Sequence, residues 1–209
     1  MNIRHVQIAT SNPGKLREYQ RLAPDSSISF DLLPGFADIP TFDESAPTFA
    51  ENAAGKALHY SRFSDGFVLA EDSGLMVPAL GGAPGVRSAR YAGANATDAD
   101  RVTKLLAEMN DKAGEDRQAR FVCVTALTRE GRAIAIVSDF VEGLISEAPR
   151  GAGGFGYDPV FFVAELRCTF AEAAPAEKDR LSHRGKAFRK MLRVIMELSS
   201  SSRAAAPVA

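Results

Sequence analysis

The chain has 209 residues, 45% of them hydrophobic, and its 25 basic and 26 acidic residues give a formal net charge of -1. This length allows one sizeable core or two small lobes, and the balanced charge argues against a polycationic surface for nucleic acid. No apolar run approaches the roughly 20 residues that span a bilayer, and the N-terminus lacks a signal-peptide pattern. We therefore expect a cytoplasmic protein that does not bind membranes.

The chain opens with a predicted strand over residues 6–9, a short polar loop and a helix. Asn12 suits the N-cap of this helix and Pro13 its first position. Backbone N–H groups at a helix N-terminus, together with a lysine, can hold phosphate. An ordinary capped helix start explains the same pattern equally well. The candidate phosphate-binding residues are Thr10, Ser11, Asn12, Pro13, Gly14 and Lys15.

A second strand is predicted over residues 29–33, followed by a loop and a helix over residues 49–63. Thr48 and Glu51 fit a capping box at the start of this helix, which is an alternative to a metal-binding role for Glu51. Lys56 lies further along the helix and is a candidate phosphate ligand, although a solvated lysine is the simpler interpretation of its spacing alone.

A short apolar strand over residues 66–70 is predicted to end at Glu71 and Asp72. Adjacent acids at a strand end repel each other, so a structural reason for both is weak. Together with Glu51 they form a set of three carboxylates, and carboxylate oxygens are ligands that Mg²⁺ prefers. The sequence therefore predicts a Mg²⁺ site made by Glu51, Glu71 and Asp72.

The next segment, residues 78–95, is rich in Gly, Ala and Pro and is predicted to be an irregular loop. A helix over residues 98–109 follows, with Thr97 as its cap. Two apolar runs, residues 119–127 and 133–141, flank a turn and predict a β-hairpin.

A glycine-rich segment then places Phe155, Gly156, Tyr157 and Asp158 in one turn. Glycines allow close approach of the backbone, and aromatic rings offer faces on which a purine base can stack, while Asp158 could accept a hydrogen bond from a ring N–H. The alternative is a tight turn whose aromatics fill the core.

A strand over residues 160–163, a charged loop and a last helix over residues 182–198 complete the fold. Ser182 is the expected N-cap of that helix, which places His183 and Arg184 in its first turn. Cations there oppose the helix dipole, so a binding role for both is favoured over surface decoration. Residues 199–209 are small and polar, and we expect a disordered tail. The expected fold class is α/β, with helices around a mixed sheet.

The chain carries five motifs in this order: Ser11-Asn12-x-x-Lys15-x-x-Glu18, Phe49-x-Glu51-Asn52-Ala53-x-x-Lys56-Ala57, Glu71-Asp72-Ser73-Gly74-Leu75, Gly154-Phe155-Gly156-Tyr157-Asp158-Pro159 and Ser182-His183-Arg184. In order and spacing, these motifs resemble the inosine/xanthosine triphosphate pyrophosphatase family over residues 5–198. One departure is Glu71, because bacterial members commonly have Asp-Asp-Ser-Gly at this point.

The resemblance implies a two-lobed mixed-sheet domain over residues 1–198 with a central substrate cleft, and usually a homodimer. It implies that Asp72 is the general base, that Glu51 and Asp72, with Glu71 less clearly, form the metal site, and that Ser73 contacts phosphate together with the loop of residues 10–15. Lys178 would be a further substrate contact. The base would be held by Phe155, Gly156, Tyr157, Asp158, His183 and Arg184.

The implied activity is hydrolysis of ITP, dITP and XTP to the monophosphate and pyrophosphate with Mg²⁺. Water would attack the α-phosphorus with help from Asp72. Arg184 or His183 would donate to the 6-carbonyl oxygen of hypoxanthine or xanthine, where adenine presents a donor instead. Two alternatives stay open at this point: a pyrophosphatase for other modified nucleotides, and a nucleotide-binding module without catalysis.

Overall fold

The structure is a computed structural model that describes residues 3–23 and 27–204. In these residues seven strands form a sheet in the order β2-β1-β3-β4-β5-β6-β7. β1 runs parallel to both of its neighbours, whereas β6 pairs antiparallel with β5 and β7, so the sheet is mixed. The strands are β1 (His5–Ala9), β2 (Ser29–Leu32), β3 (Phe67–Met76), β4 (Gln118–Arg129), β5 (Arg132–Ile145), β6 (Phe161–Val163) and β7 (Cys168–Thr169).

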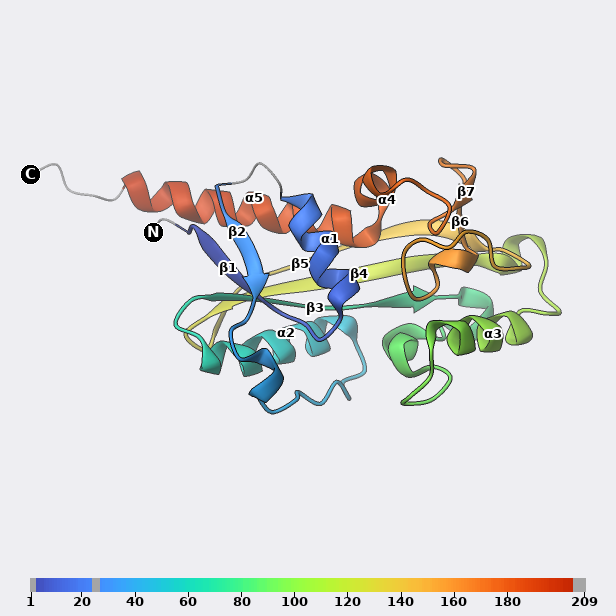
Figure 1. Cartoon of the computed structure of the whole chain (residues 1–209), viewed down its shortest axis with the longest axis horizontal. Helices are drawn as coiled ribbons and strands as arrows, with labels where there is room; N and C mark the ends of the chain where they lie inside the picture. Colours follow the sequence, from blue (N-terminus) through green and yellow to red (C-terminus); the bar gives the residue numbers. More distant parts are fainter. Residues whose placement is uncertain (1–2, 24–26, 205–209) are drawn as a thin grey trace, which may run out of the picture. The chain divides into compact units, whose positions relative to one another are not determined.

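Five α-helices accompany the described strands (Figure 1). None of the helices in this part of the chain is long and apolar enough to cross a membrane. The helices are α1 (Pro13–Leu22), α2 (Phe49–Tyr60), α3 (Asp98–Glu108), α4 (Pro175–Leu181) and α5 (His183–Ala204). The mixed sheet with helices confirms the predicted α/β class.

The chain divides into two compact units. The first unit consists of the described residues of 1–72, 124–138 and 185–209, and the second of 73–123 and 139–184. The predicted cleft between two lobes stays a prediction.

The core of the first unit lies on one face of its strands, where α1 and α5 pack (Figure 1). Alternate residues of β3, Phe67 and Leu69, point into this core, as the period of two in a strand requires. The ring of Phe188 on α5 meets the ring of Tyr19 edge-on at 5.1 Å between centroids. Tyr19 is fully buried, so its position is fixed by the core.

The core of the second unit is rich in aromatic rings from separate strands. Phe121 lies 4.5 Å from Phe161 between ring centroids, and Phe161 lies 5.3 Å from Phe170. Leu105 and Met109, at the end of α3, complete this cluster. Burial of these side chains fixes the surrounding loops, including the glycine-rich segment.

Most predicted elements and caps are confirmed. Asn12 precedes α1 and its side chain accepts hydrogen bonds from the N–H groups of Gly14 and Lys15, at 2.8 and 3.2 Å. Thr97 caps α3 in a full capping box with Asp100. The predicted hairpin is formed by β4 and β5.

The prediction that a strand ends at Glu71 is wrong. β3 continues through Glu71 and Asp72 to Met76, and Leu75 is fully buried in the core of the second unit. Pairing along the sheet satisfies the hydrogen-bonding groups of the backbone. Burial of the later apolar residues outweighs the low strand propensity of the acids and Gly74.

Two other predictions need correction. The charged loop before the last helix contains α4, which has Pro175 at its first position but no apolar period that would reveal a helix. The predicted disordered tail is wrong for residues 199–204, because α5 extends to Ala204 and the Ser199 hydroxyl donates to the carbonyl of Ile195 at 2.9 Å. Residues 205–209 lie outside the described residues.

Candidate active site

The β1–α1 loop is organised around the Asn12 cap. The Thr10 hydroxyl accepts from the N–H of Asn12 at 3.2 Å, and the Asn12 side chain takes up two N–H groups of the first helical turn. The backbone thus has the geometry of an ordinary capped helix start. Lys15, in the first turn of α1, supplies the positive charge that this segment could offer to a phosphate.

Glu71 receives two donors from α1. Its Oε1 lies 2.9 Å from the ammonium of Lys15, and its Oε2 accepts a hydrogen bond from the Tyr19 hydroxyl. The Glu71 side chain is 2% exposed and that of Lys15 16%. Glu71 is therefore a buried carboxylate whose two oxygens already contact protein donors.

Asp72 is influenced by burial and by groups of α2, α1 and the loop before α2. Burial raises the pKa of the Asp72 carboxyl above its ordinary value. Lys56 and Lys15 lower this pKa, Glu44 raises it, and a hydrogen bond from Asn52 lowers it. A buried carboxyl with a raised pKa and two lysines acting on it has the properties that general bases in active sites share.

Consecutive side chains of a strand point to opposite faces of the sheet. Both oxygens of the Glu71 carboxylate contact donors of α1, whereas Asp72 is influenced by Lys56 and Asn52 of α2 as well as by Lys15 of α1. The surroundings of the two adjacent acids therefore differ in part: Tyr19 donates to Glu71, Asn52 donates to Asp72, and Lys15 acts on both.

Glu51 lies at the N-terminus of α2 and is exposed. Its carboxylate accepts a hydrogen bond from the Thr48 hydroxyl at 2.6 Å, and that hydroxyl accepts from the N–H of Glu51 at 3.2 Å. Within residues 3–23 and 27–204, no three His, Cys, Asp or Glu side chains are grouped to hold a metal ion. The predicted three-carboxylate set is thus not assembled, and a metal here would depend on one or two carboxylates and on phosphate oxygens.

Lys56 is not the solvated lysine that its spacing alone favours. Its side chain is 12% exposed, pairs with Glu44 and donates to the carbonyl oxygen of Glu71 at 3.1 Å. Sequence reasoning missed Glu44 as a site residue, because an acid in a loop has no periodicity that assigns it a partner.

In the second unit, the glycine-rich loop is held by Asp158. The Asp158 Oδ2 atom accepts from the N–H of Phe155 at 2.8 Å and from the ammonium of Lys178 at 2.6 Å. Asp158 and Lys178 are both buried. This carboxylate therefore shapes the loop. Its predicted role toward a ring N–H of the base stays a prediction.

Two further groups fix the same loop. The Asp98 carboxylate accepts from the N–H of Gly156 at 2.7 Å, a contact that no sequence pattern indicated. The Tyr157 hydroxyl donates to the carbonyl of Ser88 at 2.9 Å, and burial raises the pKa of this phenol, which keeps it protonated. Tyr157 thus fills the core, as one sequence interpretation held.

Phe155 is half-buried and lies near two cations. The ammonium of Lys178 is 4.9 Å from its ring centroid and the guanidinium of Arg184 is 5.4 Å away. Arg184 also donates to the Ser73 hydroxyl at 3.1 Å. The structure thus brings together four predicted site residues: Phe155, Lys178, Arg184 and Ser73.

His183 lies in the core of the second unit, where its ring stacks on Phe121 at 4.7 Å between centroids. Its neighbour Arg184 is also buried, with 2% of its surface exposed. The burial of both side chains in the first turn of α5 agrees with the expectation that this pair is not surface decoration.

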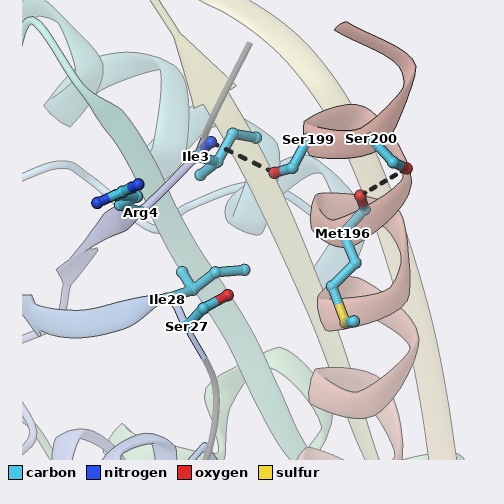
Figure 2. A pocket seen from close by; sticks show the side chains of 7 residues that line it. All are labelled: Ile3, Arg4, Ser27, Ile28, Met196, Ser199 and Ser200. Carbon is cyan, nitrogen blue, oxygen red and sulfur yellow. Dashed lines mark hydrogen bonds between the residues drawn. The ribbon is translucent and has the colours of Figure 1, made fainter. Parts of the chain in front are cut away.

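A pocket of about 500 Å³ lies elsewhere in the first unit (Figure 2). It contains none of the predicted site residues. The N–H of Ile3 donates to the Ser199 hydroxyl at its rim at 3.3 Å. The lining residues are Ile3, Arg4, Ser27, Ile28, Met196, Ser199 and Ser200.

Comparisons with known proteins give a consistent result. The model of the Ham1 family matches residues 6–194. A dITP/XTP pyrophosphatase of Geobacillus kaustophilus is 48% identical over 90% of this chain and 93% of the relative. A dITP/XTP pyrophosphatase of Vibrio cholerae is 42% identical over 93% of this chain and 98% of the relative.

Solved structures of Ham1 proteins resemble this chain over most of its length. A HAM1 protein from Coxiella burnetii superimposes with a TM-score of 0.83 at 42% identity, covering 94% of this chain and 100% of the other. The Ham1 protein of Staphylococcus aureus gives a TM-score of 0.80 at 34% identity, covering 92% of this chain and 98% of the other.

Proposed function

The chain belongs to the Ham1 family, and from this premise we propose that it hydrolyses ITP, dITP and XTP to the nucleoside monophosphate and pyrophosphate. The observation that carries the proposal is Asp72, a buried carboxylate with a raised pKa that is influenced by Lys15 and Lys56. A general base beside cations suits hydrolysis of an anionic anhydride.

In the proposed reaction, water attacks the α-phosphorus and the bond to the bridging oxygen of the β-phosphate breaks. Asp72 accepts the proton of the water, and pyrophosphate leaves. In the metal-free protein, burial raises the pKa of Asp72, which makes it a stronger base than an exposed aspartate. Lys15 and Lys56 stabilise the negative charge on the phosphates. The phosphates are oriented by the remaining predicted phosphate-binding residues, Thr10, Ser11, Asn12, Pro13, Gly14 and Ser73.

Mg²⁺ is the proposed metal. Such an ion commonly binds through one or two carboxylates and the substrate phosphates, and it would supply charge neutralisation. Asp72 fits this requirement as a buried carboxylate, and Glu51 is an exposed acid near the start of α2 that completes the proposed pair. Glu71 fits less well, because Lys15 and Tyr19 occupy its oxygens.

We assign recognition of the purine base to the second unit. Phe155 stacks on the purine, with Gly156 giving room for its approach, and Arg184 or His183 donates to the 6-carbonyl oxygen. Adenine presents a donor at this position, so two donors would face each other and ATP is rejected. Tyr157, Asp158 and Lys178 support the loop that places Phe155.

A homodimer in the cytoplasm is part of the proposal. Ile134 and Ile136 alternate along β5 in the first unit and are 41% and 49% exposed, an apolar strip that a second copy would cover. Light scattering at micromolar concentration tests the dimer: a monomer mass would contradict it.

The test of the function is steady-state hydrolysis of ITP, XTP, GTP and ATP, with Mg²⁺ or with EDTA, with pyrophosphate and orthophosphate measured separately. The proposal predicts pyrophosphate and IMP or XMP, metal dependence, and little action on ATP or GTP. Binding without pyrophosphate release would favour a non-catalytic module, and preference for another modified nucleotide would favour a related pyrophosphatase.

A further inference from the structure

We propose that Glu71 is a positioning residue that holds Lys15 in place for the triphosphate and does not ligate the metal. The inference rests on the proposed function, because it assigns Lys15 to phosphate. It concerns the one motif position at which this chain departs from the common bacterial pattern, where Asp takes the place of Glu71.

The geometry of α1 carries the first step. Lys15 and Tyr19 are four residues apart, so they lie one turn apart on the same face of the helix. Lys15 reaches Oε1 of Glu71 at 2.9 Å, and the Tyr19 hydroxyl donates to Oε2. One carboxylate therefore bridges two consecutive turns of α1.

The rigidity of this bridge comes from the core. Tyr19 has no exposed surface, and its ring packs edge-on against Phe188 at 5.1 Å between centroids. The hydroxyl of Tyr19 thus fixes the Glu71 carboxylate, which in turn fixes the Lys15 ammonium. A lysine side chain that is already held in place loses less rotamer entropy on binding a phosphate.

The direction of the side chain argues against a shared metal site. Both oxygens of Glu71 contact donors of α1, whereas its neighbour Asp72 accepts a hydrogen bond from Asn52 of α2, as expected for successive residues of a strand. Lys15 also acts on Asp72 through its charge, which places this lysine where both acids influence it. An aspartate at position 71 would be shorter by one carbon–carbon bond, about 1.5 Å, and would reach Lys15 and Tyr19 less well.

The backbone of Glu71 serves the other lysine. Its carbonyl oxygen accepts from the Lys56 ammonium at 3.1 Å. Residue 71 therefore orients Lys15 through its side chain and Lys56 through its main chain. A side-chain substitution removes only the first contact, so Lys56 remains as an internal reference.

A double-mutant cycle tests the inference. We expect Glu71→Gln to lower kcat/KM for ITP by about tenfold in the wild-type background and by less than about twofold in the Lys15→Met background, since residues that act as a unit are not additive. Tyr19→Phe, which keeps the Lys15 contact, is the matched control and should lower kcat/KM by less than about threefold. Equal effects of Glu71→Gln in both backgrounds would overturn the proposal.

Metal binding without substrate gives an independent measurement. We expect Mn²⁺, followed by electron paramagnetic resonance, to bind Glu71→Gln with a Kd within about twofold of wild type. Asp72→Asn, the positive control, should weaken Mn²⁺ binding by about tenfold or more, because loss of even an outer-shell partner of a ligand typically costs about 10–100-fold in metal affinity. A tenfold weakening in Glu71→Gln would identify Glu71 as a ligand and refute its positioning role.

Two measurements keep the test decisive. If circular dichroism shows that Glu71→Gln is unfolded, Glu71→Asp takes its place in the cycle. We then expect a smaller loss of kcat/KM that again depends on Lys15. If the wild-type chain releases no pyrophosphate from ITP, the proposed function fails. The coupling of Glu71 and Lys15 is then measured by calorimetry with pyrophosphate as the ligand, and additive effects on its Kd would refute the inference.

Discussion

The two units hold their functional residues in contrasting ways. In the first unit, charged side chains from separate segments meet: Lys15 on α1, Glu44 in a loop, Lys56 on α2, and Glu71 and Asp72 on β3. In the second unit, a single loop is held by hydrogen bonds to its own backbone and by one buried ion pair, Asp158 with Lys178.

This contrast between a charge network and a hydrogen-bonded loop indicates which task each unit suits. A network of opposite charges around a buried acid sets proton affinity and stabilises anionic groups, so its substitutions should act on the rate. A loop fixed by shape and by buried hydrogen bonds discriminates between rigid ligands, so its substitutions should act on the choice of base or on stability.

The largest effect is expected for Asp72→Asn. Loss of the general base should lower kcat by about 10³-fold. The factor should be the same for ITP and XTP, because the purine ring takes no part in the proton transfer. Stopped-time assays of pyrophosphate release measure this loss. Near-normal turnover by a folded Asp72→Asn protein would show that Asp72 is not the base.

A smaller but selective effect is expected for Arg184→Ala. Removing a charged donor should reduce the preference for ITP over ATP by about 100-fold. Ser73→Ala, which removes the hydroxyl that Arg184 contacts at 3.1 Å but keeps the guanidinium, is the matched control and should change the preference less. An unchanged ITP/ATP preference in Arg184→Ala would refute the role of Arg184.

Two glycines of the base loop form a matched pair for stability. A Cβ at Gly154 would lie 2.0 Å from Oδ2 of Asp158, whereas a Cβ at Gly156 would meet nothing within 4 Å, and both have positive φ, +72° and +64°. Both alanine variants should lose about 1–2 kcal/mol from backbone strain. Gly154→Ala should lose about 2 kcal/mol more, because the buried pair of Asp158 is disturbed. Urea unfolding measures both, and equal losses would contradict this account of the loop.

The smallest effect concerns the stability of the first unit as a function of pH. Burial raises the pKa of Asp72, so the folded state favours its protonated form and the ionised form is destabilising at neutral pH. Asp72→Asn should therefore raise the unfolding temperature at pH 7.5 in EDTA. The gain should shrink as the pH falls through the raised pKa toward the ordinary value of 3.8, because the wild-type group becomes neutral. A variant less stable than wild type at pH 7.5 would refute this sign.

The sequence predicted those features that depend on neighbouring residues. The cap at Asn12, the capping box at Thr97 and the hairpin follow from local hydrogen bonding and turn preferences, and the structure confirms them. The candidate residues Phe155, Lys178 and Arg184 do lie together in the second unit.

The features that escaped prediction depend on contacts between distant residues. Glu44 acts on Asp72 from a loop, and Asp98 reaches the N–H of Gly156, although each resembles an ordinary surface acid in the sequence. The continuation of β3 through Glu71 and Asp72 depends on sheet pairing. Such relations are set by tertiary structure and not by local propensity.

One comparison of variants tests the division of labour most directly: kcat/KM for ITP and for ATP in the wild-type, Asp72→Asn and Arg184→Ala proteins. The account predicts that Asp72→Asn lowers both values by a similar factor and leaves their ratio within about threefold of wild type, whereas Arg184→Ala reduces the ratio by about 100-fold. A changed ratio in Asp72→Asn, or an equal loss for both nucleotides in Arg184→Ala, would contradict it.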